Sequence, residues 1–198
     1  MVAASVNGYN NWARPASSNR DLNGTYYSNL ISEAKNMTGQ AKYYLGGITP
    51  TSNNGYADTS LQFYSYERKI QNTTSNEFYN GTNPNSWVGK LGLMYASDYG
   101  YASGNCENKK LYDTNSSSND IRACNGTNWL YNIKANEWLL PQGASRSYNA
   151  FYVYSDGNAH NNNVFSYQFA VRPVLYLISS AKITGGDGTI GSPYTLGL

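Results

Sequence analysis

The sequence has few charged residues and no long hydrophobic run. Asp, Glu, Lys and Arg make up only 13% of the 198 residues, and the formal net charge is +2. The densest group of cations is the pair Lys109–Lys110, which is too few for binding driven by phosphate charge. No apolar stretch reaches the length that crosses a bilayer. We therefore expect no nucleic-acid partner and no membrane insertion by this chain.

Residues that commonly carry catalysis are also scarce. His160 is the only histidine, and its Asn- and Gly-rich surroundings offer no carboxylate to orient it for a Ser-His-Asp site. The carboxylates are scattered and show no glycosidase-like pair. Gly185–Thr189 lacks the Lys and the following helix of a phosphate-binding loop. Asp156 and Asp187 could be calcium ligands, but no loop has enough carboxylates to favour that ion. We expect no enzymatic activity, no catalytic residue, no cofactor and no metal.

The chain has only two cysteines, Cys106 and Cys124. An even number of cysteines in a neutral, polar chain favours one disulfide and an extracellular setting, with two unpaired thiols as the alternative. The disulfide would close an Asn-, Ser- and Asp-rich loop and stabilise it by about 3 kcal/mol. Residues 1–5 have neither the charged nor the apolar region of a signal peptide. We interpret them as a linker remnant before a single domain over residues 6–198.

Tyrosine and small polar residues fill the places that charged residues usually take. Tyrosine occurs 20 times, and the mean hydropathy is −0.59. Tyr gives a large contact area at low entropic cost, while Ser, Asn and Gly form adaptable hydrogen bonds. Such a composition is typical of surfaces that recognise carbohydrates or proteins outside the cell.

Hydrophobic spacing predicts the elements of the first half. Apolar residues recur at helical spacing over Ser17–Lys35, where Gly24 could divide the helix in two. Residues 39–60 are expected to form loop and short strand, and residues 61–70 either a strand or a short helix. Trp87–Tyr95 is the most apolar segment of this half and is expected to be a core strand with a bulge at a glycine.

Paired strands are expected in the second half. Asn128–Tyr131 and Glu137–Pro141 resemble two strands joined by a turn. Phe151 and Val153 alternate with other residues before the Asp156–Gly157 turn, which predicts a hairpin.

The last third contains a near-continuous apolar run, Ala170–Ile178, which is expected to be a central strand. Pro173 conflicts with central pairing, so a bulge or a free donor position is needed there. Lys182–Leu196 suggests a turn and a closing strand. The expected core residues are Trp87, Trp129, Trp138, Val171 and Leu175.

The segment from Tyr148 to Tyr167 is the candidate binding region. If Phe151 and Val153 face the core, Tyr152 and Tyr154 face outward from the same strand. Exposed tyrosines beside asparagines and a histidine are typical of recognition surfaces. An ordinary Tyr- and Asn-rich sheet face is the alternative. The predicted ligand-binding residues are Tyr148, Asn149, Tyr152, Tyr154, Asn158, His160, Asn161, Asn163, Phe165 and Tyr167.

Long motifs give the chain a resemblance to a known family. Trp87–Ala102 is similar to the signature W-x-G-K-I-G-L-M-Y-P-S-D-Y-G-Y-A, with Ala96 where proline is usual. Asn128–Tyr131 and Glu137–Pro141 are similar to its N-D-W-L and W-T-L-S-P elements. Its ending, A-V-R-P-V-L-Y-L followed by K-I-T-G-G-D-G-T, is matched from Ala170 onward. The cysteine pair also falls where the family has one. On these residues the chain resembles the C-type-lectin-like ectodomains of pilin-like (prepilin-type) surface proteins of Firmicutes.

The resemblance implies an α+β, C-type-lectin-like fold, with N-terminal helices packed on a mainly antiparallel sheet with long loops. It also implies an adhesin- or receptor-type domain at the bacterial surface that binds an unknown protein or glycan, with pilus subunits as further possible partners. A structural pilus subunit without a small ligand is the alternative. A glycan hydrolase is a third reading, which a deep pocket with two facing carboxylates would support.

Some lectin-fold proteins of this kind are variable proteins, diversified by a retroelement that mutates template adenines, often in Asn codons. Such mutation does not yield Lys, Glu, Gln, Met or Trp. None of these five residue types occurs between Ser147 and Tyr167. The segment is therefore consistent with a diversified binding loop.

Overall fold

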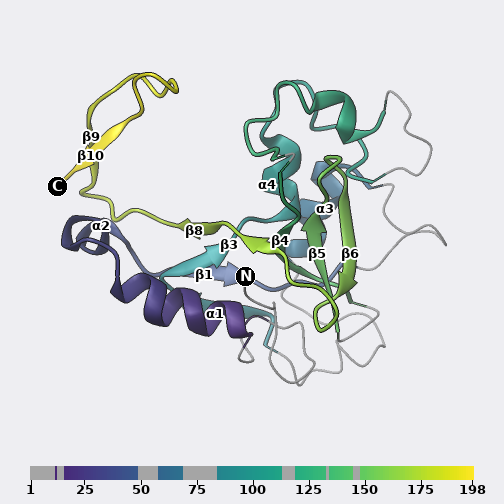
Figure 1. Cartoon of the computed structure of the whole chain (residues 1–198), viewed down its shortest axis with the longest axis horizontal. Helices are drawn as coiled ribbons and strands as arrows, with labels where there is room; N and C mark the ends of the chain where they lie inside the picture. Colours follow the sequence, from purple (N-terminus) through teal and green to yellow (C-terminus); the bar gives the residue numbers. More distant parts are fainter. Residues whose placement is uncertain are drawn as a thin grey trace.

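The computed structural model describes residues 12, 16–48, 58–68, 84–112, 119–132, 134–144 and 148–198. Short helices and short, mostly antiparallel strands are mixed along the chain, which confirms the α+β prediction (Figure 1). The linker expected at residues 1–5 lies outside the described residues.

The N-terminal helical segment is confirmed, with a different break. It consists of α1 (Ser17–Asp21), a π-helical stretch η1 (Leu22–Tyr26) and α2 (Ser32–Met37). Gly24 lies inside η1, and the chain leaves the helical path only at residues 29–31. Asn23 joins this segment to the core because its side chain bonds both the backbone N–H and the carbonyl of Leu91, at 2.9 Å each.

Two further short helices pack against each other. The sequence left residues 61–70 open to either a strand or a short helix, and the structure has a helix there, α3 (Ser60–Glu67). At its start, the Gln62 side chain accepts a hydrogen bond from the backbone N–H of Thr59. The second is α4 (Ala96–Tyr101), where Asp98 accepts from the N–H of Tyr95. Both helices therefore start at a side chain that satisfies an otherwise unpaired backbone donor.

The strands of the described residues form one four-stranded sheet and three two-stranded ones. The largest has the order β6 (Ala159–Asn163), β5 (Asn149–Val153), β4 (Glu137–Gln142) and β7 (Ala170–Val171). The β4–β7 pair is parallel and the other pairs are antiparallel. The small sheets pair β1 (Ala41–Tyr44) with β2 (Ser86–Gly89), β3 (Leu91–Leu93) with β8 (Pro173–Leu175), and β9 (Lys182–Gly185) with β10 (Thr195–Gly197).

The four-stranded sheet is covered on both faces. Leu139, Phe151 and Val153 belong to one buried cluster, together with Phe63 of α3 and Tyr99 of α4. The alternate residues Trp138, Leu140, Ala150 and Tyr152 belong to a second cluster, which also includes Leu22, Tyr43 and Leu91. Successive side chains of a strand point to opposite faces, so β4 and β5 contribute to both clusters.

Three strand predictions are corrected. The expected strand over Trp87–Tyr95 is divided at Lys90 into β2 and β3, which lie in different sheets. Asn128–Tyr131 forms turns, and β4 pairs with β5 and β7 instead. The apolar run Ala170–Ile178 is divided at Arg172 into β7 and β8, so it is not a central strand. Pro173 lacks the N–H that continuous pairing would need.

The core prediction is confirmed only in part. Trp138 is fully buried. Trp87 and Val171 are half-buried and pack against the second cluster. Trp129 and Leu175 were wrongly assigned to the core, since their exposed fractions are 77% and 38%. Trp129 lies on a turn beside the first cluster rather than on a covered strand, and Leu175 ends the short β8.

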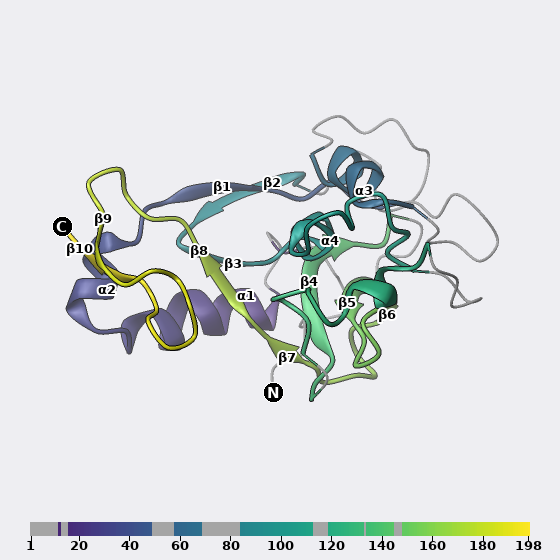
Figure 2. The same cartoon turned by 90° about the horizontal axis from the view of Figure 1, so that it is seen from above.

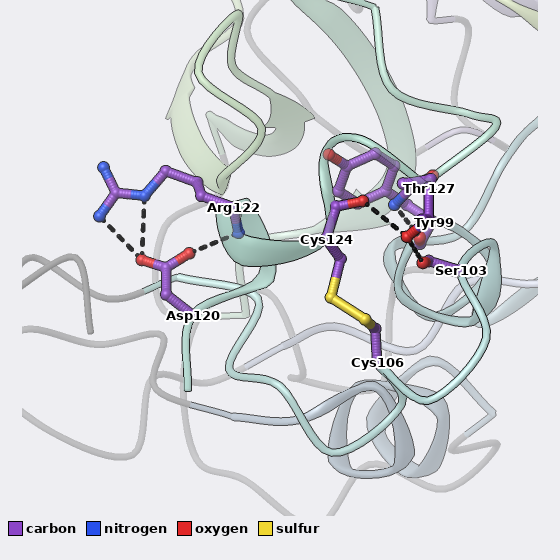
Figure 3. Close-up of a disulfide and its surroundings, with 8 residues drawn as sticks. Tyr99, Ser103, Cys106, Asp120, Arg122, Cys124 and Thr127 are labelled. Carbon is purple, nitrogen blue, oxygen red and sulfur yellow. Dashed lines mark hydrogen bonds and ion pairs between the residues drawn. A yellow bond between two sulfur atoms is a disulfide. The ribbon is translucent and has the colours of Figure 1, made fainter. Parts of the chain in front are cut away.

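The predicted disulfide between Cys106 and Cys124 is present (Figure 3). Cys124 ends a short 3₁₀ helix, η3 (Ile121–Cys124), and both cysteines are buried in the first cluster. Nearby, the side chains of Ser103 and Thr127 are hydrogen-bonded at 2.5 Å. A covalent link and a hydrogen bond thus join the chain after α4 to the chain around η3.

The β9–β10 hairpin was expected from the sequence and is present, but its side chains are mostly exposed. It lies beside α2, at the end of the molecule opposite to β5 and β6 (Figures 1 and 2). Within the described ranges, no helix is long and apolar enough to span a membrane.

Candidate functional site

The candidate site is carried by the β5–β6 hairpin, which the sequence predicted correctly. The strands pair in register from Asn149 opposite Asn163 to Val153 opposite Ala159. Gly157 in the connecting turn has a φ of +100°. A side chain at this position would strain the backbone and collide with Asn125, which explains the glycine.

The turn of this hairpin is fixed from three directions. The Tyr99 hydroxyl donates a 2.8 Å hydrogen bond to the carbonyl of Gly157. Asn125 donates to the carbonyl of Asp156 at 2.7 Å, and Arg122 contacts the Asp156 carboxylate at 3.4 Å while it pairs with Asp120 at 2.8 Å. Figure 3 shows Arg122 and Asp120 next to the disulfide. The region around the Cys106–Cys124 disulfide therefore holds the hairpin in place.

An aromatic cluster surrounds His160 on β6. The Tyr112 ring centroid lies 4.3 Å from that of His160, the Tyr154 centroid lies at 5.5 Å, and Tyr152 stacks on His160 at 5.7 Å. Tyr152 also contacts Phe169 at 4.6 Å. The Tyr112–His160 pair is slightly closer than the usual range of favourable ring pairs, and the other distances fall within that range.

The cluster continues to the chain that follows the hairpin. Phe169 lies 5.5 Å from Tyr167, which is 43% exposed, and Tyr154 is 41% exposed. We call Tyr112, Tyr154, His160, Tyr167 and Phe169, with Tyr152 beneath them, the aromatic face. It offers exposed phenol rings on a buried aromatic base.

The histidine in this face is held in its neutral form. Burial lowers the pKa of His160 below its ordinary value, and the nearby Arg122 acts in the same direction, while Asp156 and Asp120 oppose them. Its Nε2 atom is buried and has no hydrogen-bond partner among the described residues. At neutral pH, the ring therefore contributes contact area and no positive charge.

The predicted site residues do not share one face. Opposite residues of an antiparallel pair lie on the same side. His160 pairs with Tyr152, whereas Asn161 pairs with Phe151 on the other side. Asn149, whose side chain bonds that of Asn161 at 3.3 Å, shares the Asn161 side. Asn161 of β6 and Asn149 of β5 thus form a polar group next to the aromatic face, and we call this pair the polar edge of β6.

Two predicted contact residues are buried. Tyr152 is only 6% exposed, so the prediction that it faces outward is wrong. It packs against Trp138 at 5.7 Å because the second cluster covers this side of the sheet. Asn158 is 2% exposed, and its N–H and side-chain amide both donate to Asp156 to form the turn.

The remaining predicted residues reach the surface to different extents. Asn163 is half-buried, and its side chain accepts from the N–H of Phe165 to fix the next turn. The most exposed members, with fractions of 38% to 56%, are Tyr148, Tyr154, Phe165 and Tyr167. These four therefore present the largest contact areas of the predicted set.

Sequence reasoning missed Tyr112 and Phe169. Tyr112 lies in the loop between the two cysteines, and the carbonyl of Leu111 accepts the N–H of Ala159, which brings that loop to β6 at 2.8 Å. Nothing local in the sequence indicates this long-range contact. Phe169 ends the aromatic stretch from Phe165, a signal that could have extended the predicted segment by two residues.

No protein-family model, curated protein or solved structure matches the chain. No group of three or more His, Cys, Asp or Glu residues arranged for a metal ion occurs among the described residues. Functional inference therefore depends on the geometry of the aromatic face and on the sequence motifs.

Proposed function

We propose that this chain is a non-enzymatic ligand-binding domain of a bacterial surface or pilus-associated protein, of the adhesin or receptor type. The proposed contact surface is the aromatic face with the polar edge of β6. The observation that carries the proposal is the continuous set of aromatic contacts around His160, with Tyr154 and Tyr167 exposed. Exposed tyrosines on a rigid base provide contact area at little entropic cost.

The wider setting is part of the same proposal. The family motifs support a C-type-lectin-like arrangement of the α+β fold and an extracellular location at the cell surface. The disulfide is compatible with that location, because such bonds persist in oxidising compartments. The ligand class we propose is a protein or glycan at the cell surface.

We also propose that the segment between Ser147 and Tyr167 is diversified by a retroelement. The exposed rings of this segment lie beside a backbone held by strand pairing and buried residues, so they can change without loss of the sheet. Sequencing of the gene's neighbourhood tests this idea. A reverse transcriptase and a near-copy of the segment are expected, and the absence of both would reject it.

A binding screen on glycan and host-protein arrays tests the proposed face. The Tyr154→Ser/Tyr167→Ser variant is better than one that includes Tyr152, because the two side chains are exposed and their loss leaves the core intact. Tyr194→Ser is the matched control, since this tyrosine is 55% exposed near the distant β9–β10 hairpin. Near-UV circular dichroism checks that each variant is folded.

We expect at least one array signal that falls about tenfold or more in the double variant, equivalent to about 1.4 kcal/mol. The control should keep that signal. A signal that survives in the double variant, or that both variants lose equally, would contradict the proposed face.

The alternative function, a structural pilus subunit, is favoured by a different observation. Ile183, Ile190, Tyr194, Leu196 and Leu198 are exposed on or near β9–β10. Exposed apolar residues that lie together often mark association surfaces. Sedimentation over a range of concentrations distinguishes the two functions. Reversible assembly that Ile183→Ser and Leu196→Ser abolish, without any array signal, would favour the subunit.

A further inference from the structure

A hollow of about 400 Å³ lies on the outside of the first cluster, between the turn that carries Trp129 and helix α4. Its lining includes the apolar side chains of Leu130 and Val174, and Tyr101 and Trp129 also border it. Of the residues that line the hollow, none belongs to the aromatic face. The volume lies within the range of small-molecule pockets, about 300–1,000 Å³.

The exposure of Trp129 needs a physical reason. Tryptophan side chains are highly buried on average, yet Trp129 is 77% exposed, and Tyr101 beside it is 46% exposed. Large exposed aromatic groups next to a hollow mark a contact site more often than isolated ones do. The sequence placed Trp129 in the core, so its exposure is a property that only the fold reveals.

The turn that carries Trp129 is rigid. The buried Asn128 side chain accepts the N–H of Leu130 at 3.0 Å and donates to the carbonyl of Tyr99 at 2.9 Å. The backbone N–H of Asn128 also bonds the carbonyl of Cys124, which is part of the disulfide. The backbone of Trp129 is therefore held in place before any ligand binds, which lowers the entropic cost of binding.

A hydrogen-bond acceptor and a donor also line the hollow. Asp98 uses Oδ2 to accept the N–H of Tyr95, and Oδ1 has no hydrogen bond within the described part of the chain. Arg172 donates to the carbonyl of Leu130 at 3.1 Å and to Glu137 at 2.9 Å. A guanidinium has more N–H groups than these bonds use.

We propose that this hollow binds an apolar side chain of a peptide, of leucine or phenylalanine size, together with its neighbouring backbone amide groups. The side chain packs between Trp129 and the apolar lining. A peptide N–H donates to Asp98, and a peptide carbonyl accepts from Arg172. The site is separate from the aromatic face and does not depend on the function proposed for that face.

The chemistry of the lining favours this ligand over two others. A sugar ring would bury several hydroxyl groups against a mostly apolar lining, in which Asp98 and Arg172 are the only charged partners among the described residues, and unpaired buried hydroxyls are costly. An anionic ligand would gain little from Arg172, because Glu137 already forms an ion pair with it. A neutral amide with one apolar side chain matches the acceptor, the donor and the apolar lining at once.

Titration of the ¹⁵N-labelled protein with small amides tests the proposal by ¹H–¹⁵N NMR. The probes are N-acetyl-leucinamide and N-acetyl-phenylalaninamide, with N-acetyl-glycinamide as the backbone-only control and methyl glucoside as the sugar control. We expect saturable shifts of the Trp129 indole and Leu130 amide signals with the first two probes. Binding of the glycine amide should be at least about tenfold weaker, since it cannot bury a side chain.

Three variants complete the test. Trp129→Ala removes an exposed side chain and should not unfold the protein. It should lower the affinity for the apolar amides, measured from the Leu130 signal, about tenfold or more. Asp98→Asn keeps an oxygen that accepts the N–H of Tyr95, and it should weaken binding less than Trp129→Ala does. Tyr154→Ser/Tyr167→Ser should leave the titration unchanged, which separates this site from the aromatic face.

Several results would overturn the proposal. These are the absence of saturable shifts with both apolar amides up to their solubility limits, equal binding of the glycine amide, or an unchanged affinity of Trp129→Ala for the apolar amides. Stronger binding of methyl glucoside than of the amides would assign the hollow to a sugar instead.

Discussion

The two C-terminal hairpins have the same local design and opposite surroundings. β5–β6 and β9–β10 are both antiparallel pairs with a positive-φ glycine in the connection, Gly157 in the first and Gly186 and Gly188 in the second. In β5, four of the five residues are buried, whereas β9 and β10 have no buried residue. Turn chemistry and strand propensity therefore determine that a hairpin forms. The elements that pack against the hairpin determine whether its side chains are buried.

The largest contrast is expected in the cost of removing a side chain. Phe151 is fully buried and forms an edge-to-face pair with Phe63 at 5.5 Å, so Phe151→Ala should lower the free energy of unfolding by about 3–5 kcal/mol. Ile183 on β9 is 61% exposed, and Ile183→Ala should cost less than about 0.5 kcal/mol. Urea denaturation measures both. Similar losses in the two variants would remove the contrast.

The disulfide is expected to have the next largest effect. The Cys106→Ser/Cys124→Ser variant should lose about 2–4 kcal/mol of stability, because the unfolded chain is no longer restricted by the link. The loss should be accompanied by altered NMR signals at Tyr112 and His160, since the region around the disulfide positions the β5–β6 turn. Changes that are equally large in β9–β10 would show that the disulfide does not act locally.

A buried carboxyl on the β5–β6 side makes stability depend on pH. Burial raises the pKa of Glu67 from 4.5 to about 7, against the opposing hydrogen bonds from Ser97 and the charge of Arg68. Because the folded-state pKa is higher than the unfolded one, the folded protein binds more protons between these values. Stability should therefore fall as pH rises from 4.5 to about 7, by up to about 3 kcal/mol, and stay lower above that range.

Glu67→Gln should remove most of this decline while it keeps a bond to Ser97. Thermal unfolding of both proteins at a series of pH values measures the difference. An unchanged decline in the variant would assign the pH dependence to another group.

The smallest of these effects concerns the hydroxyl that fixes the β5–β6 turn. Tyr99→Phe removes the 2.8 Å bond to the carbonyl of Gly157 and leaves the ring in place, so the expected cost is about 1 kcal/mol. Hydrogen exchange near Gly157 should accelerate in this variant, and exchange in β9–β10 should not. Faster exchange at both hairpins would contradict a local role for the hydroxyl.

The sequence predicted the elements better than their surroundings. Helical spacing, the Asp156–Gly157 turn and the cysteine pair are local signals, and the structure has the corresponding helix, hairpin and disulfide. The prediction that Tyr152 is exposed assumed that one face of the sheet is open to solvent, so that alternate side chains of the strand point to water. The sheet is covered on both faces by residues that are distant in sequence, such as Leu22 and Phe63.

Isolated aromatic residues were harder to place for the same reason. Trp129 and Trp138 are both next to a leucine, but only Trp138 lies on a strand with neighbours on both sides. Tyr112 reaches the aromatic face through the contact between Leu111 and Ala159, which no local pattern encodes. Burial of such residues depends on long-range pairing and cannot be read from spacing alone.

The central claim is that the candidate recognition surface stands on a sheet that is rigid because both of its faces are covered. Hydrogen–deuterium exchange of the free protein tests it most directly. The amides of Phe151 and Val153 should be among the slowest to exchange, at rates set by global unfolding, and those of Ile183 and Leu196 should exchange much faster through local opening. Equal protection of the two hairpins, or faster exchange in β5, would contradict the claim.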